Sequence, residues 1–217
     1  MRSAVALVLA LLALPGAAEA YLDTGTRRPQ APVRAELWHE AVPEGIRWRE
    51  SRALGSPSAG RLVRGVRLPA EGARYFTWDP LLRRSPNRGW RRHGTDDLVR
   101  LVLGIVRDYA RAHPRAPRLG IGDLSRPRGG WFGPRHVSHQ NGLDVDVYYP
   151  RLDRKERPPK RPDQIDRRLA QDLVDRFVRA GAERVFVGPG TALGGPSGVV
   201  QVLVDHDNHL HVRIRAQ

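Results

Sequence analysis

The amino-acid sequence predicts an α+β fold, with a small and mostly antiparallel β-sheet and flanking helices. Two segments repeat apolar residues at helical spacing, and several short runs alternate apolar and polar residues as half-buried strands do. Glycine and proline separate these runs, so each strand is expected to be short. Residues 21–217 are long enough for one domain with a single sizeable core.

Residues 1–20 have the pattern of an export signal. Arg2 gives a positive start, residues 4–14 are almost all apolar, and Ala18 and Ala20 form a small-residue site, so we expect cleavage after Ala20. The apolar run is shorter than the roughly 20 residues that a membrane-spanning helix needs. We therefore expect an exported protein that does not span the membrane, with an uncleaved anchor as the alternative.

Two helices are expected to pack against the sheet. Thr95 can cap the first, which we expect over 96–112 with acidic residues in its first turn and Pro114 as its stop. The second is expected over 165–180, with one apolar face and Gly181 as its stop.

Most strands are predicted from short apolar runs. They are expected at residues 61–68, 74–78, 119–124, 184–187 and 199–204. In contrast, residues 21–60 are predicted to be an irregular segment lying over the core, and residues 150–164 a charged, proline-rich and solvated loop.

Two further strands carry polar side chains on one face only. The run 142–149 places apolar residues on one face and Asp144 and Asp146 on the other. The run 209–214 places apolar residues on one face and two histidines and an arginine on the other. A plain solvated face is the simplest explanation for one such strand.

The distribution of histidines argues against a plain solvated face. Five of the eight histidines lie in two short segments in or beside these strands: His136 and His139, then His206, His209 and His211. If the two strands lie side by side, Asp146 and His211 meet on the polar face of the sheet, and His139 can close over them. Two neutral imidazoles and one carboxylate form a set that zinc binds in a tetrahedron, and a catalytic site leaves the fourth position to water.

The sequence therefore predicts a zinc site on the sheet face. Zinc lowers the pKa of bound water to about 7 and polarises a carbonyl group. A nearby histidine that does not bind the metal can take and return the proton.

The composition narrows the alternatives. The absence of cysteine excludes disulfides, thiolate nucleophiles and zinc–thiolate sites. The net charge of +14 would suit nucleic acid, but the basic residues are spread along the chain without a binding motif, and export argues against that partner. A serine hydrolase based on Ser138 is disfavoured because no G-x-S-x-G turn surrounds it.

Two runs carry a resemblance to a known family. SRPRGGWFGPRHVSHQNGLDVDV (residues 125–147) and HDNHLHVRI (residues 206–214) resemble the penicillin-insensitive murein endopeptidases. These are similar to the lysostaphin-type and D-Ala-D-Ala metallopeptidases and the hedgehog domain, whose shared signature is H-x6-D followed later by H-x-H. The resemblance is weakest over residues 21–60 and 150–200.

The resemblance assigns roles to the clustered residues. It implies that His139, Asp146 and His211 bind zinc, that His209 is the general base or stabilises the transition state, and that His206 assists it. It also implies a group of residues that line the site or orient its ligands: His136, Ser138, Gln140 and Asp144.

The implied substrate is the peptide cross-link of peptidoglycan, cut in the periplasm at a D-alanyl–diaminopimelate amide. A D,D-carboxypeptidase acting on the same polymer remains the main alternative, and a non-catalytic zinc protein that binds the cell wall is a further one. One zinc per chain is expected. A second metal would find no histidine between residues 150 and 205, and only weak candidates in Asp172 and Asp175.

Overall fold

The computed structural model describes residues 45–134 and 136–216, and all of these belong to one compact unit. The expected signal peptide at 1–20 and much of the expected irregular segment at 21–60 lie outside the described residues. A single domain from residue 21 therefore stays a prediction. In the part of the chain that the structure describes, no helix has the length and apolar character needed to cross a membrane.

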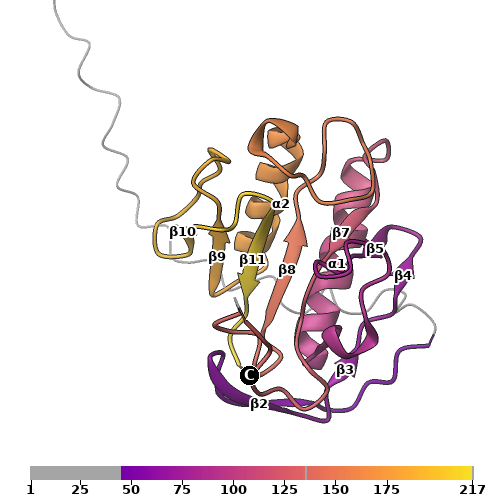
Figure 1. Cartoon of the computed structure of the whole chain (residues 1–217), viewed down its shortest axis with the longest axis vertical. Coiled ribbons are helices and arrows are strands. Elements are labelled where there is room, and N and C mark those ends of the chain that lie inside the picture. Colours follow the sequence, from indigo (N-terminus) through magenta and orange to yellow (C-terminus); the bar gives the residue numbers. More distant parts are fainter. Residues whose placement is uncertain (1–44, 135, 217) are drawn as a thin grey trace, which may run out of the picture. The chain divides into compact units, whose positions relative to one another are not determined.

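A seven-stranded sheet lies at the centre of the described residues (Figure 1). Its order is β10–β9–β11–β8–β7–β5–β4. The strands are β4 (Glu71–Gly72), β5 (Tyr75–Thr77), β7 (Leu119–Ile121), β8 (Asp144–Tyr148), β9 (Arg184–Val187), β10 (Val200–Val202) and β11 (His209–Arg213). The pairs β10–β9 and β5–β7 are parallel, and the other neighbouring pairs are antiparallel. The α+β class with a mostly antiparallel sheet is confirmed.

Two small sheets precede the first helix. β1 (Arg52–Ser56) and β2 (Ala59–Val63) form a hairpin, so the prediction of an irregular segment up to residue 60 was wrong for this part. β3 (Val66–Arg67) pairs with β6 (His93–Gly94). The single strand predicted at 61–68 is thus two strands, because Arg64 between them adopts a left-handed backbone with φ of 53°.

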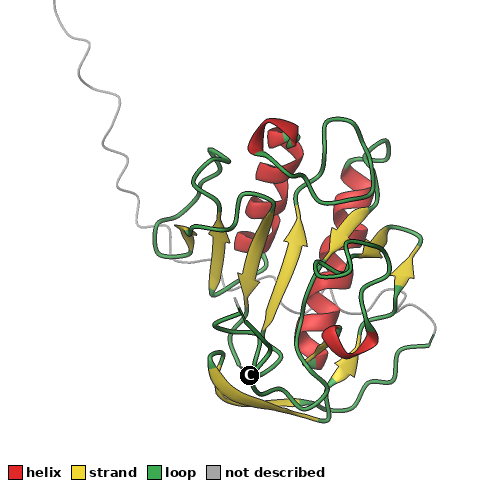
Figure 2. Cartoon of the chain, in the orientation of Figure 1, coloured by secondary structure: helices red, strands yellow, loops and turns green. Residues whose placement is uncertain are grey.

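Both helices lie on the same side of the large sheet (Figure 2). α1 (Asp96–Ala112) begins where predicted, because the Thr95 hydroxyl accepts a hydrogen bond from the main-chain N–H of Leu98. α2 (Arg167–Arg179) begins two residues later than predicted, because the Asp166 carboxylate caps it. The described residues also contain two short 3₁₀ helices, η2 (Gly89–Arg91) and η3 (Pro162–Gln164).

The sheet face beneath the helices forms the hydrophobic core. Val145 and Val147 of β8 and Leu210 and Val212 of β11 are fully buried there, as their alternation predicted. Burying each such side chain is worth roughly 1.5–3 kcal/mol. This packing fixes which face of β8 and β11 carries the polar residues.

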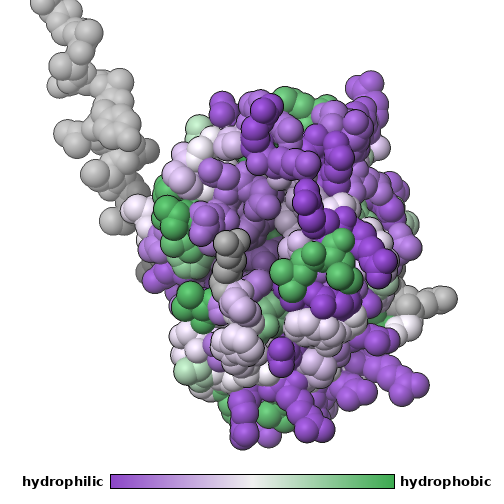
Figure 3. Space-filling view, in the orientation of Figure 1, coloured by the Kyte–Doolittle hydropathy of each residue, from purple (hydrophilic) through white to green (hydrophobic). Residues whose placement is uncertain are grey.

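The opposite face of these strands is also buried, and the segment 125–141 lies against it. Asp144 is fully buried and His211 is 6% exposed. The β1–β2 hairpin holds this segment through main-chain hydrogen bonds, from Gly130 N–H to the Gly60 carbonyl and from Gln140 N–H to the Pro57 carbonyl. On the face seen in Figure 3, hydrophilic residues predominate and apolar residues form separate patches.

Candidate metal centre

Strands β8 and β11 bring the two clusters together, since they pair antiparallel as neighbours. Their register places His211 directly opposite Asp146 and His209 opposite Tyr148. These side chains share one sheet face because successive residues of a strand alternate between faces. The predicted contact between the two strands is confirmed.

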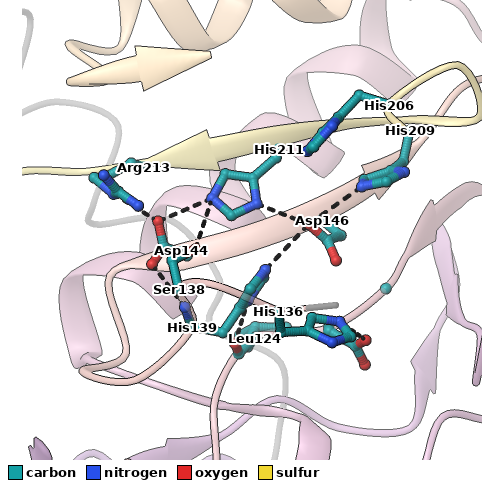
Figure 4. A network of polar contacts seen from close by, with 12 residues as sticks. Leu124, His136, Ser138, His139, Asp144, Asp146, His206, His209, His211 and Arg213 are labelled. Atoms are coloured by element: carbon teal, nitrogen blue, oxygen red, sulfur yellow. Dashed lines mark hydrogen bonds and ion pairs between the residues drawn. The ribbon is translucent and has the colours of Figure 1, made fainter. Parts of the chain in front are cut away.

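His139, Asp146 and His211 converge on one point (Figure 4). Each offers a ligand atom within 4.8 Å of the others. Oδ1 of Asp146 lies 3.3 Å from Nε2 of His139 and 3.2 Å from Nδ1 of His211. None of these contacts has the geometry of a hydrogen bond, so this buried oxygen has no hydrogen-bond partner among the described residues. A buried carboxylate oxygen without a donor is costly unless a cation completes its surroundings.

His139 is oriented from two sides. Its Nδ1–H donates to the Leu124 carbonyl at 2.5 Å, which leaves Nε2 with a free lone pair toward Asp146. Its main-chain N–H donates to Oδ2 of Asp144 at 3.1 Å. The residue has a left-handed backbone with φ of 67°, a conformation that costs free energy in a non-glycine residue and is concentrated at functional sites.

His211 is oriented by Asp144. Nε2–H of the ring donates to Oδ1 of Asp144 at 3.0 Å, so Nδ1 faces Asp146 as the free nitrogen. Arg213 Nε also donates to Oδ1 of Asp144, at 2.7 Å. Burial would raise the pKa of Asp144, but the His211 hydrogen bond and the charges around it hold that pKa well below its usual value. Asp144 therefore stays ionised.

The centre attracts positive charge. Burial lowers the pKa of His211, but the hydrogen bond to Asp144 and the negative charges of Asp144 and Asp146 outweigh it and raise that pKa to about 9. The pKa of His139 is raised for the same kind of reason, chiefly by Asp146 against the effect of burial. Charge interaction with His139 outweighs burial and holds the pKa of Asp146 well below its usual value, so this carboxylate stays ionised. An ionised carboxylate facing two imidazoles is a donor set that suits a divalent cation.

His209 and His206 lie beside the centre without belonging to the group of three. Nε2 of His209 is 3.6 Å from Oδ1 of Asp146, and Nδ1–H donates to Oδ1 of Asn208 at 2.6 Å. Burial lowers the pKa of His209 to about 4, so the ring is neutral near pH 7 with a free nitrogen facing the site. Nδ1–H of His206 donates to the Val204 carbonyl, and its ring lies 4.7 Å from that of His209.

The remaining residues predicted to line the site or orient its ligands are His136, Ser138 and Gln140. His136 packs against Phe132 and contacts Oδ2 of Asp123 through Nε2 at 3.2 Å. Ser138 Oγ is 3.5 Å from Nε2 of His211. Gln140 takes part through its main chain, which joins the segment 125–141 to the hairpin.

A buried ion pair beneath the site was missed by sequence reasoning. Asp123, within the run LGIGDL (residues 119–124), receives two hydrogen bonds from the Arg91 guanidinium at 2.6 and 2.5 Å and one from the Asn87 amide at 2.9 Å. Its carbonyl accepts from Asp146 N–H, so it supports the strand that carries the carboxylate. An aspartate within an apolar run was the one available signal.

Asp123, His136 and Asp146 form a second group of convergent ligand atoms. An ion there would lie beside the Arg91 guanidinium, whose charge already compensates Asp123, and this disfavours a second cation. Asp172, the weak candidate named above, instead pairs with His113 and Arg176.

Comparison with known proteins places the chain in a family. The family model described as penicillin-insensitive murein endopeptidase matches residues 53–187, more than half of the chain. The match contains His139 and Asp146 and ends before His211.

Curated relatives carry the same description. The penicillin-insensitive murein endopeptidase of Yersinia enterocolitica is 28% identical over 190 residues, and that of Yersinia pestis is 30% identical over 193 residues. Each alignment covers 76% of this chain and 66% of the relative, so the chain spans just under two thirds of their length. The Pectobacterium atrosepticum protein is 27% identical over 215 residues, which is 83% of this chain and 73% of the relative. The chain belongs to the penicillin-insensitive murein endopeptidase family.

Proposed function

We propose that this protein is an exported, zinc-dependent murein endopeptidase that hydrolyses D-alanyl–diaminopimelate amides in the peptide cross-links of peptidoglycan. The observation that carries the proposal is the convergence of His139, Asp146 and His211 on one buried point. Membership of a family named for murein endopeptidase activity supports the choice of substrate.

Zinc is the metal that this donor set fits best. His139 would contribute Nε2, His211 would contribute Nδ1, and Asp146 would contribute Oδ1, because the other ring nitrogens are engaged by Leu124 and Asp144. When bound, zinc polarises the carbonyl under attack and lowers the pKa of water to about 7. A set of two histidines and one carboxylate leaves a tetrahedral position open.

His209 is the proposed general base. Its ring is neutral near pH 7, and its free Nε2 faces the centre while Asn208 holds Nδ1–H. It can therefore accept a proton from the attacking water and pass it to the leaving amine, a contribution of about 10²–10⁴-fold in such reactions. His206 packs against this ring and assists in orienting water or the developing oxyanion.

Asp144 and Asp123 position the reacting groups rather than react. Asp144 selects the tautomer of His211 and fixes the main chain of His139. Asp123 holds His136 at the edge of the site and supports β8 through its carbonyl.

Export to the periplasm completes the proposal. The charged start, the apolar run and the small residues before residue 21 support a cleavable signal. Peptidoglycan lies outside the cytoplasmic membrane, where such a signal would deliver the protein.

Digestion of purified peptidoglycan, followed by mass analysis of the released fragments, tests this function. We expect cross-linked dimers to be converted to monomers, with the activity lost on chelation and restored by zinc. Release of free D-alanine from uncross-linked stems would instead identify a D,D-carboxypeptidase. Binding to peptidoglycan without any cleavage would identify a non-catalytic zinc protein.

A further inference from the structure

A cavity of about 570 Å³ opens beside the metal centre. Asn208 lines it and also accepts the hydrogen bond from Nδ1–H of His209. Tyr148, which lines it as well, lies opposite His209 in the strand register and on the same sheet face as Asp146. The cavity therefore continues the polar face of β8 and β11 away from the metal ligands.

Three cations line this cavity without a carboxylate partner. Arg83 comes from the turn after β5, and Arg157 and Lys160 come from the loop between β8 and η3. Other cations of the same loop are neutralised locally, since Arg151 pairs with Asp153 and Arg161 with Asp163. Across the described residues, no ion pair involves the three that line the cavity.

Two carboxylates line the same cavity from another segment. Asp205 and Asp207 flank His206 just before β11. Asp207 accepts a hydrogen bond from Gly190 N–H at 2.8 Å, and neither carboxylate has a cationic partner among the residues that the structure describes. The cavity thus presents unpaired charges of both signs on separate segments of chain.

We propose that this cavity binds a free amino-acid end group of the peptide substrate. Arg157 and Lys160, with Arg83, hold its carboxylate, and Asp205 and Asp207 hold its ammonium group. Diaminopimelate carries an amino-acid group at each end, so a stem peptide in which one end is joined to the chain can leave the other end free. The inference rests on the proposed murein substrate and names the part of it that is recognised.

Three forms of a cross-linked peptide dimer test the proposal. In the first the diaminopimelate end group is free, in the second its carboxylate is amidated, and in the third its amine is acetylated. The double variant Arg157→Gln/Lys160→Gln tests the cationic side, and Asp205→Asn tests the acidic side. Asn suits position 205 because it tolerates the left-handed backbone, with φ of 63°, found there. Lys155→Gln is the matched control, since it removes a charge from the same loop outside the cavity.

For the wild type we expect KM to be about 10-fold lower for the free dimer than for either blocked form, as for the loss of one charge-assisted contact. The double variant should no longer prefer the free dimer to the amidated dimer. Asp205→Asn should no longer prefer the free dimer to the acetylated dimer. Lys155→Gln should keep both preferences. A wild type that cuts all three forms equally, or variants that weaken all three equally, would overturn the proposal. A wild type whose KM rises for the amidated form but not for the acetylated form would also overturn the proposal. Recognition of a terminal carboxylate alone would explain that result.

Failure of the proposed function is distinguishable from failure of the cavity. If the wild type cuts no dimer, titration calorimetry with free meso-diaminopimelate tests the cavity directly. Binding that is weakened by both cavity variants and unchanged by Lys155→Gln supports the inference. Absence of binding, or binding that the variants leave unchanged, refutes it.

Discussion

Asp144 accepts a hydrogen bond from Nε2–H of His211 at 3.0 Å, on the opposite side of the ring from Asp146. The bond fixes which nitrogen of His211 is free and turns it toward Asp146. The other oxygen of Asp144 accepts the main-chain N–H of His139. One buried carboxylate therefore positions two of the three proposed ligands.

Asp144→Asn should weaken zinc binding by about 10–100-fold, the usual cost of losing a group that orients a metal ligand. The amide can still fill the space, but its NH₂ group cannot accept a hydrogen bond. Either His211 and Arg213, which share Oδ1, or the His139 main-chain N–H at Oδ2 therefore loses its acceptor. Competition with a chromophoric chelator measures the change in affinity. Asp163→Asn, at an exposed surface ion pair, serves as the control and should leave affinity unchanged. Equal affinities for the wild type and Asp144→Asn would remove Asp144 from this role.

His211→Ala and His209→Ala should separate metal binding from proton transfer. The first removes a proposed ligand and should abolish both zinc retention and activity. The second should keep zinc and lower kcat by about 10²–10⁴-fold, because it removes only the proposed base. Metal analysis after dialysis, together with turnover of a cross-linked dimer, distinguishes them. Zinc retained by the first variant, or lost from the second, would mean that the two roles are reversed.

Gly188→Ala should lower activity although Gly188 itself contributes no functional group to the site. A Cβ atom at position 188 would lie 2.5 Å from main-chain atoms of both His206 and Asp207, so the segment that carries His206 must move. A shift of about 1 Å at a catalytic group can cost roughly 10²-fold in rate. Gly194→Ala is the control, because a Cβ atom there meets nothing within 4 Å. Unchanged kcat in Gly188→Ala would show that the placement of His206 is not critical.

Asp79→Asn should remove part of the acid sensitivity of folding. Burial raises the pKa of Asp79, but hydrogen bonds from Leu82 N–H and from Arg88 outweigh it and hold that pKa below its usual value. A lowered pKa in the folded state stabilises the fold above the unfolded pKa of about 3.9, and this contribution is lost as pH falls through the folded pKa.

Urea unfolding of the wild type and Asp79→Asn at pH 7 and pH 3 measures this contribution. The variant should be less stable at pH 7 by about 1–3 kcal/mol, because charge-assisted hydrogen bonds are lost. The gap should narrow at pH 3. A gap of constant size at both pH values would show that the charge of Asp79 does not contribute.

Local patterns predicted much of this fold. Thr95 marks the start of α1, and strict alternation assigned the two faces of β8 and β11, because capping and side-chain period act within a few residues. The same alternation made Asp146 and His211 candidates for one site, with His139 just before its strand. The resemblance to the murein endopeptidases, through the H-x6-D and H-x-H signature, implied the same three residues.

Long-range features could not be predicted in this way. The pairing of Arg91 with Asp123 joins residues 32 positions apart, and no local period marks either partner. The β1–β2 hairpin was missed because its residues are mostly exposed, so they lack the apolar alternation that marks a half-buried strand. The cavity beside His209 is built from four separate segments, which only the folded chain brings together.

An anomalous-difference map, collected at the zinc absorption edge from crystals of zinc-loaded protein, would show whether His139, Asp146 and His211 bind zinc together. We expect one strong peak in contact with Nε2 of His139, Nδ1 of His211 and the carboxylate of Asp146. A zinc-loaded crystal with no peak at this point, or with its peak bound by other residues, would contradict this expectation.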